Sequence, residues 1–189
     1  MRTKTALILL AEGCEEMEVV ILVDVLRRGG MRVTMAGLEP GEVVASRGVR
    51  LLPDMPLDAV TDAKSYDLLL LPGGMPGTER LREDVRVRDL VIAQLADPEK
   101  CLGAICAAPL VLDACGVLEG RRFTCYPAVA AQIEHGTRVD APVVQDGQLL
   151  TSQGPGTAMA FGVTLLQVLL GADAARDVAA GLLFDPLSV

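Results

Sequence analysis

One cysteine of this sequence lies where a backbone turn would make its side chain reactive. Cys106 follows a short apolar run, Leu102 to Ile105, and precedes good helix formers that extend from Ala107 to Ala114. The pattern predicts a strand-to-helix turn at Cys106. Unpaired backbone N–H groups and the positive end of the helix dipole would favour the thiolate there. We therefore consider Cys106 a candidate nucleophile, against the plainer interpretation of a buried cysteine that packs as a small hydrophobe.

A glutamate stands among apolar residues in the first expected helix. Glu18 lies in the run from Met17 to Val23, and all the remaining residues of this run are apolar. A carboxylic acid in apolar surroundings has a raised pKa, stays protonated near neutrality and can donate a hydrogen bond. A protonated Glu18 beside a Cys106 thiolate would be such a donor. The alternative is a glutamate at the helix edge that points to water.

Strands that alternate with helices would position these two residues. Continuous apolar runs predict strands, and amphipathic or apolar stretches that end at glycine predict helices. The expected strands span residues 4–11, 32–38, 67–71, 102–105 and 121–126. The expected helices span residues 15–28, 79–96, 107–114, 128–135, 157–170 and 172–183, and two hairpins are expected within 42–52 and 139–152.

This alternation predicts an α/β fold, with a doubly wound, mostly parallel sheet and helices on both faces. In such a sheet, ligands bind at the carboxyl ends of the strands. Cys106, the Gly73–Gly74 loop and the turn at 12–15 each follow an expected strand, so we expect them to meet. The glycine loop lacks the known phosphate-binding motifs, and a tight turn with close backbone approach is the expected role.

Length and charge limit the classes of function. The 189 residues are predicted to form a single domain, 1–189, with a formal net charge of −8. This charge opposes binding to nucleic acid and to anionic membrane surfaces. No apolar run approaches the roughly 20 residues of a membrane span, and no signal-peptide cleavage site follows the first apolar run. We expect a soluble cytoplasmic protein.

The cysteines and the histidine do not form a metal-binding pattern. The five cysteines include no C-x-x-C pair and there is one histidine, which predicts reduced thiols, no metal and no other cofactor. Hydrophobic residues make up 51% of the chain. So high a share suggests that some apolar surface is buried against a second copy of the chain, and we expect a homodimer.

Five segments of the sequence carry a resemblance to a known family. They are Gly-Cys-Glu-Glu-Met-Glu at 13–18, Val-Asp-Val-Leu-Arg-Arg at 23–28, Leu-Pro-Gly-Gly at 71–74, Ala-Ile-Cys-Ala-Ala-Pro at 104–109 and Leu-Thr-Ser-Gln-Gly-Pro-Gly-Thr at 150–157. These segments resemble the DJ-1/ThiJ/PfpI superfamily and, within it, the DJ-1 branch with its bacterial YajL-like members. The resemblance extends over essentially the whole chain, with the segments in the family's order and spacing. The resemblance implies a flavodoxin-like fold that forms homodimers.

The same resemblance implies roles for individual residues. Cys106 matches the family's nucleophile at a sharp turn, and Glu18 matches a protonated glutamate. Gly74 and Ala107 match positions whose backbone N–H groups suit the stabilisation of an oxyanion.

The rim of the implied site includes one departure from the family pattern. Arg28 and Arg47 match arginines that help form an anion-binding rim. Tyr126 stands where many members have a histidine near the cysteine. Tyrosine, with a pKa of about 10, is a poor proton shuttle near neutrality but a sound hydrogen-bond donor. This argues against a histidine-dependent step, and His135, nine residues further along, is not expected to replace it.

Two functions follow from the resemblance. The first is a cysteine-dependent enzyme in oxidative and carbonyl stress defence: a glutathione-independent glyoxalase acting on small dicarbonyls such as methylglyoxal, or a protein deglycase acting on glycated proteins. The second is a redox sensor or redox-regulated chaperone in which Cys106 oxidises to the sulfinate without significant turnover. Cys14 and Cys125 are candidate resolving thiols for it. Cysteine peptidase chemistry fits less well, because Ala107 stands where those branches have histidine.

Overall fold

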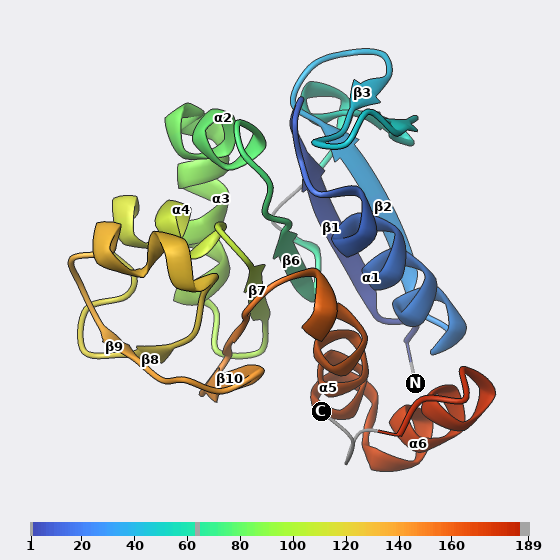
Figure 1. The fold of residues 1–189 in the computed structure, drawn as a ribbon. Helices are drawn as coiled ribbons and strands as arrows, with labels where there is room; N and C mark the ends of the chain where they lie inside the picture. Colours follow the sequence, from blue (N-terminus) through green and yellow to red (C-terminus); the bar gives the residue numbers. More distant parts are fainter. Residues whose placement is uncertain (1, 63–64, 186–189) are drawn as a thin grey trace.

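The core of the fold is a seven-stranded sheet (Figure 1). The computed structural model describes residues 2–62 and 65–185. The strand order is β10-β11-β7-β6-β1-β2-β5, and every pairing is parallel except that of β10 with β11. The strands are β1 (Thr5–Leu10), β2 (Arg32–Gly37), β5 (Met55–Pro56), β6 (Leu68–Leu71), β7 (Cys101–Ile105), β10 (Val143–Asp146) and β11 (Leu149–Ser152).

Helices cover both faces of this sheet, which confirms the predicted α/β class (Figure 1). One layer contains α1 (Glu16–Arg28), α5 (Ala158–Leu170) and α6 (Ala172–Gly181), and the other contains α2 (Gly77–Glu83), α3 (Val85–Ala96) and α4 (Pro109–Ala114). The smaller elements are β3 (Val43–Val44), β4 (Arg50–Leu51), β8 (Arg122–Phe123), β9 (Thr137–Arg138), and the 3-10 turns η1 (Leu57–Ala59), η3 (Pro127–Gln132) and η4 (Pro155–Thr157). Over the described part of the chain, no helix is long and apolar enough to span a bilayer.

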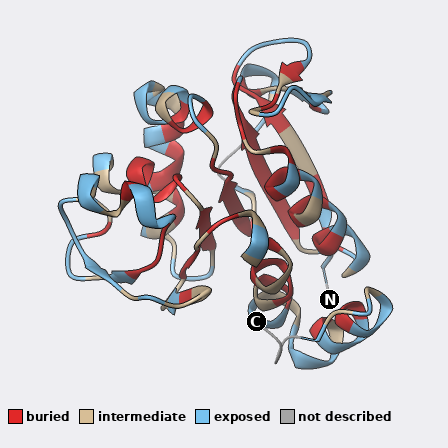
Figure 2. Cartoon of the chain, viewed as in Figure 1, coloured by how far each residue is buried: buried red, intermediate tan, exposed pale blue. Residues whose placement is uncertain are grey.

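The first strand shows why the sheet has a core on each face. Successive side chains of a strand point to opposite sides. Ala6, Ile8 and Leu10 pack in the core beneath α1 and α5. Leu7 and Leu9 pack in the core beneath α2, α3 and α4. Every residue of β1 is buried (Figure 2), so the strand requires the uninterrupted apolar run that the sequence shows.

Three expected elements differ from the structure. The helix expected over 79–96 is two helices, because Asp84 adopts an extended conformation and its carboxylate caps α3 by accepting the Arg86 N–H at 2.8 Å. The strand expected over 121–126 is only β8, because the chain then turns so that the Tyr126 N–H donates to the Cys106 carbonyl. The short helix expected at 128–135 is the 3-10 turn η3, Pro127–Gln132.

A buried carboxylate holds the amino-terminal edge of the sheet. Asp67 is 3% exposed. It accepts hydrogen bonds from the Thr5 N–H at 2.8 Å and the Thr5 hydroxyl at 3.0 Å, and from Lys4 Nζ at 3.1 Å and an Arg2 guanidinium nitrogen at 2.6 Å. Burial raises the pKa of Asp67, but the Thr5 and Lys4 donors outweigh burial and hold this pKa below its usual value.

We expect Asp67→Asn to lower the free energy of unfolding by about 2 kcal/mol near neutral pH, because charge-assisted hydrogen bonds are lost. Since the pKa of the folded state is lowered, the stability that the carboxylate contributes is present above its unfolded pKa of about 4 and is lost as the pH falls through the folded-state value. Urea unfolding at neutral and at strongly acidic pH measures this. A difference between variant and wild type that did not shrink in acid would contradict the assignment.

Candidate active site

The nucleophile candidate stands at a sharp turn between β7 and α4. Cys106 has a φ of +65°, a left-handed conformation that is uncommon for residues other than glycine. Its N–H donates to the Ser152 carbonyl at 2.9 Å, and its own carbonyl accepts the Tyr126 N–H at 2.8 Å. Two neighbouring segments therefore hold the turn in its strained conformation. The expected turn after the strand is present, with Cys106 at the carboxyl end of β7.

The glycine loop after β6 passes in contact with this turn. A Cβ on Gly73 would lie 2.5 Å from the Cβ of Cys106, and a Cβ on Gly74, whose φ is +89°, would lie 2.4 Å from the Glu15 nitrogen. Only glycine fits either position. The close approach brings the N–H groups of Gly74 and Ala107 onto the Cys106 sulfur, where both lower the pKa of the thiol.

Glu18 is fully buried beside Cys106. Its Oε2 accepts the Gly73 N–H at 2.7 Å, and its Oε1 has no conventional hydrogen-bond partner among the described residues. Burial raises the pKa of Glu18 to about 7, although the Gly73 N–H and the Cys106 side chain act in the opposite direction. The alternative of a glutamate that points to water is therefore wrong.

The backbone N–H groups at the turn favour the Cys106 thiolate, as expected, but burial of the sulfur has the larger effect on its pKa. Burial raises the pKa of the Cys106 thiol to about 12, with the charge and the hydrogen bond of Glu18 as further causes, and the N–H groups of Gly74 and Ala107 oppose this only in part. The helix that follows, α4, begins three residues later at Pro109 and has only 6 residues. The helix dipole that the sequence suggested is correspondingly weak.

Cys106 and Glu18 interact closely enough to titrate as a pair. Glu18 is the group that loses the first proton, near pH 7, and the raised pKa of the Cys106 thiol keeps the remaining proton mainly on the sulfur. In a minor form of the pair that proton resides on Glu18. When it resides on Glu18, the carboxyl is neutral and can donate to the sulfur. Glu18 then stabilises the thiolate instead of opposing it.

A hollow of about 440 Å³ opens over Cys106. Its lining brings together Cys106, Gly74, Ala107, Arg47 and Tyr126, five of the seven residues that the sequence singled out. Glu15, which also lines it, belongs to the turn at 12–15 that was expected to meet Cys106. Sequence reasoning did not single out the rest of the lining, which is Ser46, Met75, Ala128, Val129 and Pro155. Met75 directly follows the Gly73–Gly74 loop, and that adjacency was the available signal. The others are placed by tertiary contacts.

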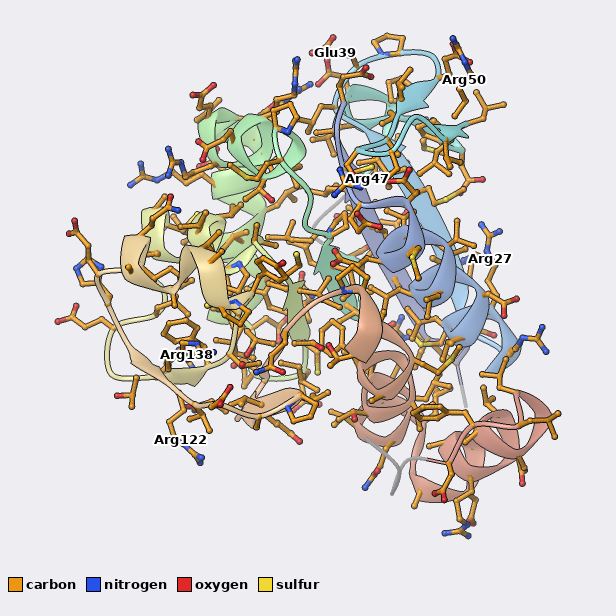
Figure 3. All side chains as sticks on the ribbon, in the orientation of Figure 1. Arg27, Glu39, Arg47, Arg50, Arg122 and Arg138 are labelled. Carbon is orange, nitrogen blue, oxygen red and sulfur yellow. The ribbon has the colours of Figure 1, made fainter. Side chains whose placement is uncertain are left out.

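The β3–β4 hairpin reaches this hollow because hydrogen bonds tie it to the start of α1. The Ser46 hydroxyl lies 2.9 Å from an oxygen of Glu15 and 2.9 Å from an oxygen of Glu16, and the Arg47 N–H donates to Glu16 at 2.9 Å. Arg47 consequently lies at the rim, near the amino-terminal end of α1 (Figure 3).

Arg28 and His135 lie away from the hollow. Arg28 is the last residue of α1, where its Nε donates to Asp24 at 2.6 Å, and it does not line the hollow. The anion-binding role expected for Arg28 is therefore not supported within one chain. His135 is exposed and its Nδ1 lies 2.9 Å from an Asp113 oxygen. It does not line the hollow either, as expected.

The two candidate resolving thiols are buried. Cys14 and Cys125 are both 0% exposed, and neither lines the hollow over Cys106. Burial raises the pKa of Cys14 to about 12. Burial also raises the pKa of Cys125, against an opposing effect of the Arg138 guanidinium. These positions do not support a role in thiol exchange with Cys106.

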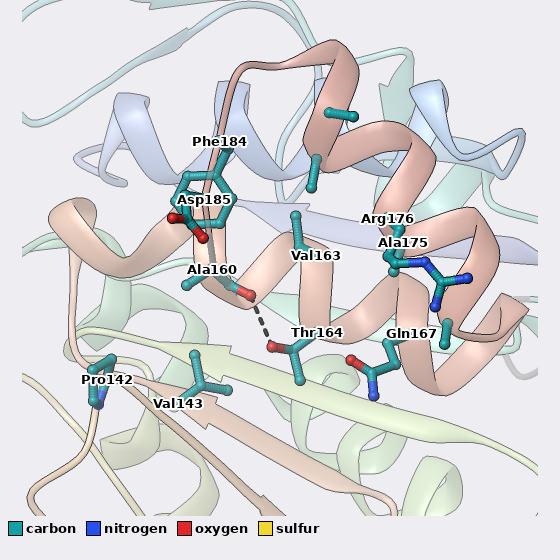
Figure 4. Close-up of a pocket in the computed structure, with 13 residues that line it drawn as sticks. Pro142, Val143, Ala160, Val163, Thr164, Gln167, Ala175, Arg176, Phe184 and Asp185 are labelled. Carbon is teal, nitrogen blue, oxygen red and sulfur yellow. Dashed lines mark hydrogen bonds between the residues drawn. The ribbon is translucent and has the colours of Figure 1, made fainter. Parts of the chain in front are cut away.

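A larger hollow of about 830 Å³ lies beside α5 and α6 and offers no comparable chemistry (Figure 4). Its charged lining residues among those described are Arg176 and Asp185, and none of its described lining residues is a cysteine. Within residues 2–62 and 65–185, no cluster of three or more histidine, cysteine or acidic residues could hold a metal ion. The hollow over Cys106 is therefore the candidate active site.

Comparison with known proteins identifies close relatives. The DJ-1/PfpI family model matches residues 4–168. Protein dj-1beta of Drosophila melanogaster is 44% identical over 184 residues, covering 96% of this chain and 97% of that protein, and its crystal structure has a TM-score of 0.93, covering 97% and 100% of the two chains. A Caenorhabditis elegans protein named glutathione-independent glyoxalase DJR-1.2 is 39% identical, covering 89% of this chain and 90% of that protein. Toxoplasma gondii DJ-1, solved as the oxidized protein, is 35% identical with a TM-score of 0.91, covering 96% and 99%.

Proposed function

The chain belongs to the DJ-1/PfpI family, and we propose that it is a cysteine-dependent enzyme of reactive carbonyls, a glutathione-independent glyoxalase or protein deglycase in oxidative and carbonyl stress defence. The observation that carries the proposal is the pairing of Cys106 with a buried Glu18 whose pKa is raised to about 7, beneath an open hollow. The relative named as a glyoxalase supports it.

The first step of the proposed reaction is addition to the aldehyde. With the shared proton on Glu18, the Cys106 thiolate attacks the aldehyde carbon of methylglyoxal and forms a carbon–sulfur bond. The electron pair of the carbonyl moves to its oxygen. The N–H groups of Gly74 and Ala107 stabilise the charge on that oxygen, and its protonation gives a hemithioacetal.

The second step is an internal oxidation and reduction. Glu18 transfers a proton from the former aldehyde carbon to the neighbouring carbonyl oxygen. This gives an enediol. A proton then adds to the second carbon while the hydroxyl of the first carbon loses its proton, so that the first carbon becomes a thioester and the second an alcohol, and neither an oxidant nor a reductant is consumed. Water then hydrolyses the thioester and releases lactate and the Cys106 thiol. Deglycation would begin with the same attack on a carbonyl adduct of a protein side chain, with Arg47 and Tyr126 as contacts at the rim.

A second candidate function is a redox sensor or redox-regulated chaperone. The observation that favours it is the accessible Cys106 sulfur, which lines an open hollow, with Glu18 placed to donate a hydrogen bond to a sulfinate. The relative solved in an oxidized form gives it further support.

The test that separates the two functions is lactate formation from methylglyoxal without glutathione and without an oxidant. The carbonyl enzyme should form lactate over many turnovers. The intact mass of the protein before and after mild peroxide treatment is the second measurement. No lactate, together with a gain of two oxygen atoms confined to Cys106, would overturn the enzyme proposal in favour of the sensor.

We also propose a homodimer formed through the exposed apolar side of α1. Met17 is 54% exposed and Val20, three residues later on the same helix, is 52% exposed. The adjacent β3–β4 hairpin, which is hydrogen-bonded to the start of α1, exposes Val49 at 48% and is followed by Leu52 at 74%. An apolar patch of this kind on a folded protein is typical of an interface.

Val20→Glu should convert the dimer to a monomer, because it places an unpaired charge in the interface. Val85→Glu is the matched control, since Val85 is 67% exposed on α3, in the opposite helical layer. Sedimentation velocity at micromolar concentration measures both. A wild-type monomer, or a Val20→Glu variant that remains dimeric, would refute this interface.

A further inference from the structure

Two rim residues lie between the active-site hollow and a second hollow. Tyr126 lines the hollow over Cys106 and also a shallower hollow of about 240 Å³. The second hollow is formed largely by the loop Gly154 to Gly156. Pro155 is the other residue that lines both. Tyr126 and Pro155 therefore form the boundary between the two hollows.

Tyr126 is anchored through its backbone and remains partly exposed. Its N–H is bonded to the Cys106 carbonyl at 2.8 Å, which fixes its backbone relative to the nucleophile. A Cβ on Gly154 would lie 3.4 Å from Tyr126 Cδ2, so one part of the ring packs against bare backbone. The residue is still 46% exposed. An aromatic surface is thus available beside the reactive sulfur.

The surroundings of the ring are mostly apolar. Met75, Ala128 and Val129 line the hollow over Cys106. In the second hollow, the Thr157 hydroxyl is already bonded to the Gly154 carbonyl at 2.9 Å. A hollow of 440 Å³ lies within the range of about 300–1,000 Å³ that holds ligands of drug size. The methyl group of methylglyoxal would leave most of this space unfilled.

We propose that Tyr126 determines specificity and favours α-oxoaldehydes that carry an aromatic substituent. The aldehyde carbon lies at Cys106, and the aromatic ring of the substrate stacks on Tyr126 toward the second hollow. This inference rests on the proposed carbonyl chemistry and uses the same steps. Phenylglyoxal and one water molecule give mandelate, just as methylglyoxal and water give lactate.

The test compares kcat/KM for phenylglyoxal with kcat/KM for methylglyoxal. The ratio should favour phenylglyoxal in the wild type and persist in Tyr126→Phe, which keeps the aromatic face. It should fall about tenfold in Tyr126→Ala, which removes that face. Measurement of the intact protein mass after the assay checks that phenylglyoxal has not modified arginine side chains.

A second variant fills the shallower hollow without touching Tyr126. A Cβ on Gly156 meets no atom within 4 Å, so Gly156→Leu can be accommodated and should lower the same ratio. A ratio that is unchanged in both Tyr126→Ala and Gly156→Leu would overturn the inference while leaving the carbonyl enzyme intact. So would a stronger preference for a polyhydroxylated dicarbonyl such as 3-deoxyglucosone.

Binding of the products gives a readout that does not depend on turnover. Ligand-observed NMR should show tighter binding of mandelate than of lactate to the wild type, and Tyr126→Ala should lose this preference. If neither aldehyde is turned over, the proposed function fails, and the two product affinities still decide whether Tyr126 forms an aromatic subsite. Equal affinities for mandelate and lactate would then overturn it.

Discussion

Cys106→Ser should reduce kcat/KM for methylglyoxal at least about a thousandfold, because loss of a nucleophile removes a whole catalytic unit. Serine preserves the shape of the side chain, but an alcohol is a far weaker acid than a thiol. The desolvation that already raises the pKa of the Cys106 thiol to about 12 would keep a serine hydroxyl neutral. Lactate formation without glutathione measures the loss.

The matched control for this variant is Cys115→Ser. Cys115 caps the carboxyl-terminal end of α4, is partly buried and does not line the hollow. This variant should retain wild-type activity. Retention of activity by Cys106→Ser would show that the assigned mechanism is wrong, and loss in both variants would point to an effect on folding, which thermal unfolding would reveal.

The second large effect is expected at Glu18. Glu18→Gln and Glu18→Ala should each lower kcat/KM by about 10²–10⁴, the usual contribution of a general acid–base group. The thiol pKa should be lower in Glu18→Gln than in Glu18→Ala, because the amide can still donate a hydrogen bond to a thiolate. The pH dependence of thiolate absorbance in the ultraviolet measures this order.

The pH profile of the wild type shows whether ionisation of Glu18 raises or lowers activity. Its kcat/KM should rise through about pH 7, where the pair loses its first proton. This step should be absent from Glu18→Gln. Since the pKa of Glu18 is raised in the folded state, the free energy of unfolding of the wild type falls as the pH rises through that value. The stability of Glu18→Gln relative to the wild type should therefore increase over the same pH range. An unchanged pH profile in Glu18→Gln would contradict the pairing.

Local sequence pattern points to two residues of the site, whereas the family resemblance supplied Gly74, Ala107, Arg47 and Tyr126. Glu18 interrupts an apolar helix and Cys106 stands between a strand and a helix, and both prove to lie at the site. The protonation equilibrium was not predictable in the same way. It depends on how deeply tertiary packing buries the two groups, and the sign of the Cys106 shift follows from that burial.

The break between α2 and α3 shows a similar limit. Good helix formers precede Asp84, the β-branched residues Val85 and Val87 alternate with arginines after it, and no glycine or proline marks a boundary. The boundary depends on Arg86, which binds Asp58 at 2.6 Å and the Leu38 carbonyl at 3.1 Å. These partners are distant in sequence. Local preference therefore predicted the helix but not its interruption.

Because the backbone of Cys106 is left-handed, the residue found at this position in a related gene indicates whether the sulfur is still under selection. A φ of +65° costs a residue with a Cβ about 1–3 kcal/mol, and glycine would adopt it without that cost. Stability alone would therefore replace this cysteine over evolutionary time. A copy of this gene that has glycine or asparagine at the position would identify a lineage in which the demand for the sulfur has ended while the fold persists.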